Sequence, residues 1–210
     1  GDRLVIASCR LIGHQDTLFT GPLPPKEIEP DGFIGPKQFA PRINGRQYYK
    51  NCYICGDIDF IFGSATAYFE NCVIESLCHT TNVNDIQGYI TAASTPESQE
   101  YGYVFSNCKL ISKNCPPNSV YLGRPWRNYA KTVFLECALG NHIHECGFHD
   151  WKKEDARNTV LYAEYRNYPA SSADTTSNNR SLNDDIHCID GRCIPYPHRA
   201  EYVCELDAVQ

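Results

Sequence analysis

The sequence has no methionine, few tryptophans, no long apolar run and no run of Lys or Arg. Twenty-five acidic against 19 basic residues leave a formal net charge of −6. Binding to a nucleic-acid backbone needs a basic stripe, so we expect no nucleic-acid partner. The apolar runs are a handful of residues long, against the roughly 20 residues of a transmembrane helix. We therefore expect no membrane span either.

The start of the chain also lacks familiar features. A chain without methionine has no initiator residue, and Leu4–Ala7 is strand-like without the charged and apolar regions of a signal peptide. We interpret the sequence as a cropped or processed piece. Within it, 42% hydrophobic and 21% charged residues argue against disorder. One principal domain is expected, burying roughly 70% of the surface of the unfolded chain.

Three catalytic signatures are missing: the Gly-x-Ser-x-Gly elbow, the Gly-x-x-x-x-Gly-Lys phosphate loop and His-Glu-x-x-His. Serine-hydrolase and nucleotide-binding functions therefore lose most of their support. The densest metal-like cluster runs from His142 to His149 and includes His144 and Cys146, residue types that bind Zn²⁺. No second ligand pair accompanies it, so a polar loop is the favoured interpretation. We predict no metal and no cofactor.

An internal repeat decides the fold. Five segments alternate apolar and polar residues and then end in a polar residue, Cys, any residue, and Ile or Leu, a pattern typical of short strands with one buried face. They are Leu4–Leu11, Arg46–Ile54, Ala67–Ile74, Tyr103–Leu110 and Lys131–Leu139. Their cysteines are separated by 43, 20, 36 and 29 residues. A parallel β-helix tolerates such variation, because insertions enlarge the loops while the strands stay in register. The sequence predicts this all-β solenoid rather than an alternating βαβ sheet.

The 12 cysteines fall into two groups. Five occupy the equivalent repeat position and are predicted to stack as small buried hydrophobic residues: Cys9, Cys52, Cys72, Cys108 and Cys137. The remaining seven are an odd number, so they cannot all pair with one another: Cys55, Cys78, Cys115, Cys146, Cys188, Cys193 and Cys204. The pair Cys188 and Cys193 could close a small loop, and composition leaves the redox compartment open.

Two stretches interrupt the strand pattern. Residues 21–45 are rich in Pro and Gly and are predicted to form a surface loop, either walling a cleft or simply solvated. From Pro169 a Ser/Asn-rich run indicates a linker. We therefore predict a β-helix domain over residues 1–168, and a linker with a cysteine-containing tail of unassigned role over residues 169–210.

Two aspartates share one position in the repeat. Asp16 lies seven residues after Cys9, and Asp59 lies seven residues after Cys52. In stacked coils this equal offset places the two carboxylates on neighbouring strands, about 5 Å apart. Like charges at that distance raise one pKa, so that one acid is protonated while the other stays ionised. Such a pair can supply a nucleophile and a proton donor without serine, histidine or metal. Turn aspartates at coil corners are the alternative.

A third element is Leu122–Trp126, in which Gly and Pro flank Arg124. A turn of this composition can direct a guanidinium and an aromatic face toward a cleft, where one orients a carboxylate and the other stacks on a sugar. A structural Arg with a packed Trp is the alternative interpretation.

Four strings in this order closely resemble the pectin methylesterases, over the chain from its first residues to about Tyr168. They are Gln15–Leu18, Asp59–Gly63, Gly88–Ala93 and Leu122–Trp126. The resemblance implies a right-handed parallel β-helix, in agreement with the repeat. Earlier coils of the family's fold, which carry a second oxyanion glutamine, would precede Gly1, so we expect an N-terminally truncated β-helix.

The resemblance also implies the catalytic roles. Asp59 matches the nucleophile that attacks the methyl-ester carbonyl, and Asp16 matches the acid that protonates methanol and then activates water. Gln15 matches a donor to the oxyanion, and Arg124 matches the guanidinium that keeps the nucleophile ionised and oriented.

Aromatic residues are implied to bind the sugar chain: Phe62, Trp126 and, with less support, Trp151. The family's Gly-Trp-x-x-Trp segment differs here, since Phe148 stands at the first Trp position. The loop over residues 21–45 is expanded relative to plant members, which suggests a microbial-type cleft.

The sequence thus predicts a secreted, monomeric pectin methylesterase that converts methyl-esterified homogalacturonan to pectate and methanol through an aspartyl acyl-enzyme. Two alternatives stay open. One is a non-catalytic pectin-binding β-helix, and the other is a β-helix esterase with another acyl substrate, such as a thioester. A lyase or glycosidase has less support, because no acidic cluster accompanies the two aspartates.

Overall fold

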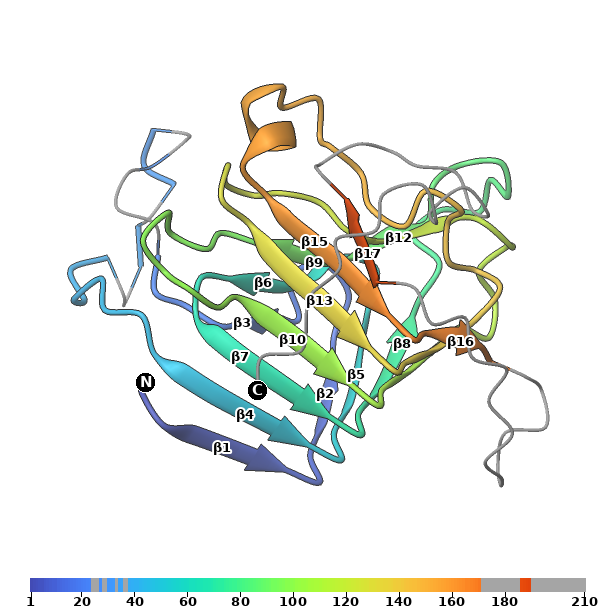
Figure 1. Ribbon diagram of the computed structural model, residues 1–210, viewed down its shortest axis with the longest axis horizontal. Helices are drawn as coiled ribbons and strands as arrows, with labels where there is room; N and C mark the ends of the chain where they lie inside the picture. Colours follow the sequence, from blue (N-terminus) through green and yellow to red (C-terminus); the bar gives the residue numbers. More distant parts are fainter. Residues whose placement is uncertain (24–26, 28–29, 33, 36–37, 171–185, 190–210) are drawn as a thin grey trace.

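The computed structural model describes residues 1–23, 27, 30–32, 34–35, 38–170 and 186–189, the last four by their backbone alone. Three sheets wind along one axis (Figure 1): the first four coils each contribute one strand to each sheet in turn, and the last two coils contribute strands only to the seven-stranded and six-stranded sheets. Adjacent strands pair in parallel, apart from the pairing of β15 with β17. The predicted all-β parallel β-helix is confirmed, and crossovers between parallel strands of one sheet are right-handed in nearly all proteins.

The strands are grouped by sheet. The seven-stranded sheet contains, in spatial order, β1 (Leu4–Ala7), β4 (Arg46–Lys50), β7 (Thr66–Glu70), β10 (Tyr103–Ser106), β13 (Lys131–Leu135), β15 (Leu161–Tyr165) and β17 (Ile186–Ile189). The six-stranded sheet contains β2 (Arg10–Ile12), β5 (Tyr53–Gly56), β8 (Val73–Ser76), β11 (Lys109–Ile111), β14 (Ala138–Leu139) and β16 (Tyr168–Pro169). The four-stranded sheet contains β3 (Leu18–Phe19), β6 (Ile58–Gly63), β9 (Gly88–Ala93) and β12 (Val120–Gly123). One 3₁₀ helix, η1 (Asp155–Asn158), is the only helix among the described residues.

Each predicted repeat is two strands joined by a tight corner. The residue before the repeat cysteine has φ between 50° and 54°, in the left-handed region, and three of the five corner residues are Asn: Ser8, Asn51, Asn71, Asn107 and Glu136. Asn tolerates this conformation better than most residues with a Cβ. The corner therefore turns the chain from the seven-stranded sheet into the six-stranded sheet at the same point of each coil.

The interior repeats from coil to coil. Cys52, Cys72, Cys108 and Cys137 are at most 1% exposed, which confirms the predicted stack for these four. The thiol of Cys108 donates to the carbonyl oxygen of Phe69 on the neighbouring coil at 3.4 Å. The fifth member, Cys9, lies on the outermost described coil and is exposed. All five are free thiols, so the stack is a packing feature and contains no cross-link.

The structure contains a sixth coil that the repeat pattern did not predict. Strands β15 and β16 continue the first two sheets, and Asn167 occupies the position of the repeat cysteine. Its side-chain oxygen accepts a hydrogen bond from the backbone N–H of Cys137 at 2.9 Å. The preceding Arg166 has φ of 49°, so the corner geometry is kept although the cysteine is lost.

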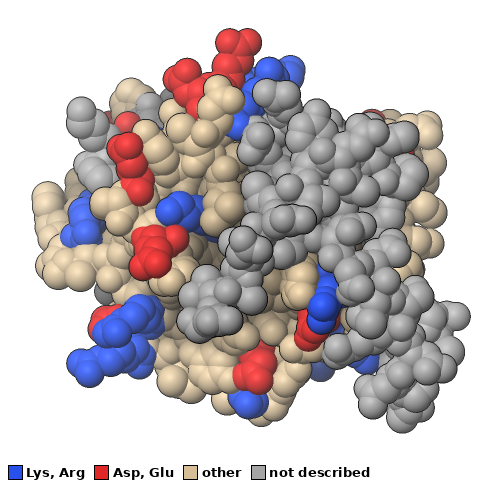
Figure 2. Space-filling model, in the orientation of Figure 1, with Lys and Arg blue, Asp and Glu red and all other residues tan. Residues whose placement is uncertain are grey.

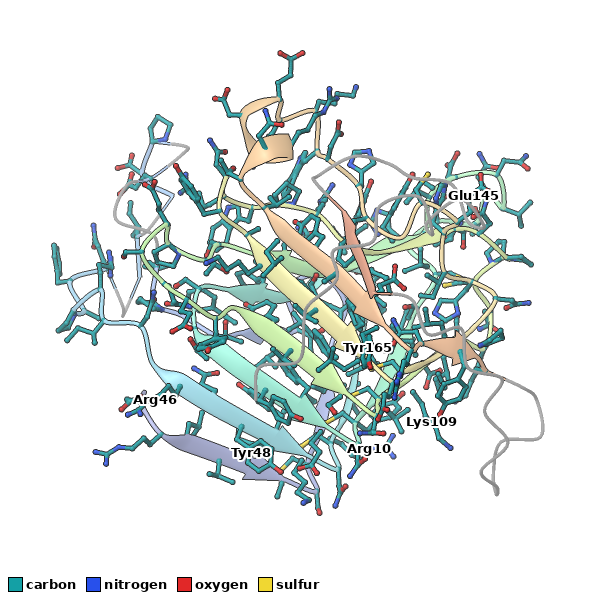
Figure 3. The ribbon with its side chains drawn as sticks, in the orientation of Figure 1. Arg10, Arg46, Tyr48, Lys109, Glu145 and Tyr165 are labelled. Carbon is teal, nitrogen blue, oxygen red and sulfur yellow. The ribbon has the colours of Figure 1, made fainter. Side chains whose placement is uncertain are left out.

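Along the strands of the seven-stranded sheet, successive side chains alternate between the core and the outer face. On β4, Tyr49 is buried while its neighbour Tyr48 lies on the outer face, as expected for successive strand residues (Figure 3). On the side shown in Figure 2, acidic and basic side chains are interspersed over the described residues. No helix in the described ranges is long and apolar enough to cross a membrane.

The predicted loop over residues 21–45 connects β3 to β4, and eight of its residues lie outside the described part. Its role as the wall of a microbial-type cleft stays a prediction. Within the predicted tail, residues 186–189 form β17, which pairs with β15 and which the sequence pattern did not indicate. The proposed loop closed by Cys188 and Cys193 lies outside what the structure describes, and the division at residue 168 stays a prediction.

Candidate active site

The two aspartates lie on neighbouring coils, as their equal offset predicts. Strands β3 and β6 pair with Leu18 opposite Ile61, a register that sets Asp16 opposite Asp59. The backbone N–H of Asp16 donates to the carbonyl oxygen of Ile58 at 3.1 Å. Both aspartates have positive φ, 57° for Asp16 and 50° for Asp59. This shared corner conformation aligns the two segments at the start of the four-stranded sheet.

Asp59 is held by a two-pronged ion pair. Arg124, directly after β12, donates from Nε to Oδ1 at 2.8 Å and from Nη2 to Oδ2 at 2.7 Å. The side chains are only 15% and 10% exposed. Paired guanidinium bonds of this kind fix both the charge and the orientation of a carboxylate. Arg124 comes from a coil two turns further along the solenoid, so stacking alone brings the pair together.

The guanidinium of Arg124 is itself clamped between two rings. Its central carbon lies 3.8 Å from the ring centroid of Tyr89 and 3.8 Å from that of Trp151. Stacking on aromatic faces stabilises a partly desolvated cation, most strongly on Trp. The clamp leaves the guanidinium edge to point at Asp59.

The surroundings separate the two carboxylates electrostatically. Burial raises the pKa of Asp59, and the two bonds from Arg124 oppose that change. For Asp16, burial and then the negative charge of Asp59 raise the pKa. Arg124 directs its hydrogen bonds to Asp59 rather than to Asp16. The pKa of both carboxyl groups is raised overall; the bonds from Arg124 favour the ionised form of Asp59, and the charge of Asp59 favours the protonated form of Asp16.

Aromatic side chains line the same sheet face. The rings of Phe62 and Phe19, on adjacent coils, stack with centroids 4.8 Å apart. Trp126 meets Phe62 with centroids 5.7 Å apart and planes at 58°. Trp151 lies against Arg124 instead of against these three rings. The three rings form an apolar strip next to the carboxylates.

Gln15 immediately precedes Asp16 and is exposed, so its amide is open to a bound molecule. Its turn is tied down by the hydroxyl of Thr17, which contacts the carbonyl oxygens of His14 at 3.0 Å and Cys55 at 2.9 Å. The Gln15–Asp16 segment is thus anchored to the neighbouring coil.

Sequence reasoning missed two members of the site. Tyr89 lies within the Gly88–Ala93 string but was given no role. The ammonium of Lys153 donates to the carbonyl oxygens of Pro125 and Trp126, each at 2.8 Å. Burial lowers its pKa to about 8. Neither role could be inferred from the local sequence, because Tyr89 acts through Arg124 and Lys153 through Pro125 and Trp126, which are distant in sequence.

The His and Cys side chains in the predicted polar loop from His142 to His149 do not converge on one point. The ring of His144 stacks on Tyr121 with centroids 4.1 Å apart, and Cys146 is disulfide-bonded. His142 is 1% exposed, and burial lowers its pKa to about 4. Across the described ranges, no three His, Cys, Asp or Glu side chains are grouped so that they could bind a metal ion.

This arrangement suits covalent chemistry at a carbonyl group. An ionised, oriented carboxylate can attack the carbon, and a neighbouring acid can give its proton to the leaving group. An adjacent amide can donate to the oxygen that becomes negative.

Comparison with known proteins identifies similar sequences and structures. The family model described as "Pectinesterase" matches residues 42–185. "Probable pectinesterase/pectinesterase inhibitor 13" of Arabidopsis thaliana is 36% identical over 185 residues, covering 84% of this chain and 26% of that protein.

Two solved structures are also similar. A pectin methylesterase from carrot has 26% identity and a TM-score of 0.63, over 83% of this chain and 49% of that chain. A pectin methylesterase in complex with a hexasaccharide has 28% identity and a TM-score of 0.58, over 86% and 52%. The chain thus spans between a quarter and about half of the length of these relatives.

Proposed function

The chain belongs to the pectinesterase family, and from that premise we propose that it hydrolyses the methyl esters of galacturonate units in pectin, releasing methanol. The observation that carries this proposal is the buried Asp59–Arg124 pair beside Asp16. It combines an oriented carboxylate with a second acid whose pKa is raised, in a family whose members are named for this ester hydrolysis.

In the proposed reaction, Asp59 begins as the nucleophile. One of its carboxylate oxygens attacks the ester carbonyl carbon, and the carbonyl oxygen becomes negative. Arg124 keeps Asp59 ionised before attack, and the clamp of Tyr89 and Trp151 limits the guanidinium to one orientation. The amide of Gln15 is the proposed donor to the oxyanion, and donors of this kind contribute several kcal/mol where they are preorganised.

Asp16 then moves the proton in both halves of the reaction. As an acid it protonates the departing methoxy oxygen, so methanol leaves and an acyl-enzyme on Asp59 remains. As the carboxylate it next takes a proton from water, which attacks the acyl carbon and frees Asp59. The raised pKa of Asp16 supports the first role, because the acid form persists to higher pH than for an ordinary aspartate.

The proposed substrate is the methyl-esterified polygalacturonate chain. The strip of Phe19, Phe62 and Trp126 offers the flat apolar faces on which sugar rings stack. The similarity to a pectin methylesterase bound to a hexasaccharide supports a polymeric ligand. Since such a polymer lies outside cells, we propose secretion, and action as a monomer.

The test is methanol release from methyl-esterified pectin by the chain and by Asp59→Asn. We expect the substitution to reduce turnover by at least about 10³-fold, because the amide cannot act as the nucleophile. Binding of the polymer should change little, since the proposed sugar contacts lie on the aromatic strip.

The matched control is Glu75→Gln, which alters a carboxyl side chain that is similarly buried, at 3% exposure, but pairs with Tyr53 away from Arg124. It should retain methanol release. Undiminished turnover by Asp59→Asn, or no methanol from the folded parent chain, would contradict the proposal.

A further inference from the structure

Two cysteines outside the buried stack face one another across neighbouring coils. Cys78 follows β8 and Cys115 lies beyond β11, and their sulfur atoms are 3.7 Å apart. Cys78 is exposed and Cys115 is partly buried. Both are free thiols in this structure. No motif in the sequence pointed to this pair, because 37 positions separate the two residues.

The backbone keeps the two thiols at this distance. Strands β8 and β11 pair with Glu75 opposite Ile111, and paired strands lie about 4.8 Å apart. The pairing therefore brings the turns that follow β8 and β11 side by side. The hydroxyl of Ser112 donates to the carbonyl oxygen of Ser76 at 2.7 Å and accepts from the backbone N–H of Cys115 at 3.0 Å. The turn carrying Cys115 is therefore fastened to the coil that carries Cys78.

The stacked cysteines differ from this pair in burial, and the thiol of Cys115, like theirs, also donates to a backbone carbonyl oxygen of the neighbouring coil, that of Ser76 at 3.6 Å. Cys72 and Cys108 are 1% exposed, and their thiols donate to backbone carbonyl oxygens of the neighbouring coil. A thiol that is occupied and shielded from solvent reacts slowly with an external oxidant. Cys78, in contrast, is open to solvent and has a partner thiol as its nearest sulfur contact.

We propose that Cys78 and Cys115 are an oxidative cross-linking site, at which a low-molecular-weight disulfide, such as oxidised glutathione, joins the two coils. The exposed Cys78 thiolate attacks one sulfur of the donor, forming a mixed disulfide and releasing one thiolate. The Cys115 thiolate then attacks Cys78 Sγ and releases the second. The two protons lost by the cysteines pass to the two released thiols, so the protein loses two electrons and the donor gains them.

The order of the two steps follows from the environments of the thiols. Burial and the neighbouring Cys78 thiol raise the pKa of Cys115 to about 11, which suits it to react second, within the mixed disulfide.

The cross-link would hold His79 in place. His79 directly follows Cys78, and its Nδ1 lies 3.7 Å from Oδ2 of Asp57. Asp57 is 5% exposed and also lies 3.2 Å from Nδ1 of His14. Since Asp57 and His14 each lie two residues before one of the paired aspartates, the bond would brace the corner from which both segments start. The proposed site does not depend on the ester-hydrolase function.

The decisive experiment is a peptide map of the full chain after incubation with oxidised glutathione and then unfolding in the presence of an alkylating agent, which blocks all remaining thiols. Chymotrypsin cleaves after Leu77 and Tyr89 and after Leu110 and Tyr121, which isolates each cysteine in a peptide with no other cysteine. We expect one species with the summed mass of peptides 78–89 and 111–121 less two hydrogen atoms. The stacked cysteines should be recovered alkylated, which makes them an internal control.

Stability supplies an independent readout. The oxidised chain should melt roughly 5 °C or more above the reduced chain, because the bond restricts a long loop of the unfolded state. In Cys78→Ser and Cys115→Ser this oxidation-dependent increase should disappear while the reduced melting temperature stays close to that of the parent. Recovery of Cys78 and Cys115 as separate alkylated or glutathionylated peptides would overturn the proposal, as would an unchanged oxidation-dependent increase in Cys78→Ser.

Discussion

The interior stack and the active-site face are built on the same coils but follow opposite rules. In the interior, Phe69, Phe105 and Phe134 lie in register, with centroids 4.4 and 4.6 Å apart and planes within 10° of parallel. At the active-site face, each coil contributes a different group. Asp59 and Arg124 come from different coils, and the pairing of β6 with β9 shifts between Ile58 and Ile61. Repetition therefore marks what stabilises the solenoid, and departure from repetition marks where chemistry is concentrated.

The distinction has an energetic basis. A stacked interior residue is buried by identical neighbours on both sides, so each coil gains the same apolar contact. An acidic pair on neighbouring coils instead disfavours its own ionised state, because burial and the negative charge of Asp59 both raise the pKa of Asp16. Substitutions in the two regions should consequently affect different measurements, and the following predictions use that separation.

The largest effect is expected at the active-site face, from Asp16→Asn. Loss of the acid and base should lower turnover on methyl-esterified pectin by roughly 10²–10⁴-fold. The pH profile of kcat/KM in the parent should fall on the alkaline side through a pKa above the ordinary aspartate value, because protonated Asp16 is required. The residual activity of the variant should lack this alkaline limb.

The same substitution should not lower the stability of the fold, in contrast to its effect on turnover. The folded-state pKa of Asp16 is raised, so the folded chain binds its proton more tightly than the unfolded chain does. That contribution is present below the unfolded pKa and is lost as the pH rises through the folded value. At neutral pH, Asp16→Asn should thus melt no lower than the parent. A large fall in melting temperature would show that ionised Asp16 stabilises the fold, contrary to the comparison.

The interior stack should show the reverse pattern in Phe105→Ala. Phe105 is fully buried between two parallel rings, so truncation leaves a cavity and should lower the free energy of unfolding by about 3–5 kcal/mol. Turnover per folded molecule should be nearly unchanged. The denaturant midpoint measures the loss, with Tyr68→Ala as the matched control, because Tyr68 is 40% exposed on the outer face of the adjacent strand. Equal losses in the two variants would remove the distinction between the buried and outer faces.

The features of the fold that recur from coil to coil could be predicted from the sequence. Cysteine spacing gave the strand pairs and the buried stack, and the equal offset of Asp16 and Asp59 predicted that they lie on neighbouring coils. Local alternation is enough for these inferences, because each coil packs on the next. The corner conformation was also accessible in principle, since Asn recurs before the repeat cysteine.

The remaining features depend on contacts that no local pattern encodes. The sixth coil was missed because Asn167 replaces the cysteine that defined the repeat. The clamp on Arg124 joins Tyr89 and Trp151 from different coils. The sequence around Arg124 indicated that it orients a carboxylate, but not which rings hold the guanidinium. Loop lengths differ between coils, so only the assembled solenoid determines which distant side chains meet.

The smallest effect is expected at a corner residue with positive φ, a backbone conformation found in both the interior coils and the active-site segments. Asn71 is exposed with φ of 53°, a conformation close to those of Asp16 and Asp59. Asn71→Ala should reduce the free energy of unfolding by about 1 kcal/mol, because a Cβ without a polar side chain disfavours left-handed geometry. Asn71→Gly should cost little, since glycine adopts this φ freely. If alanine and glycine destabilised the chain equally in denaturant titrations, the side-chain contacts of Asn71 would explain the loss. The preference for Asn at this corner would then not come from its left-handed backbone conformation.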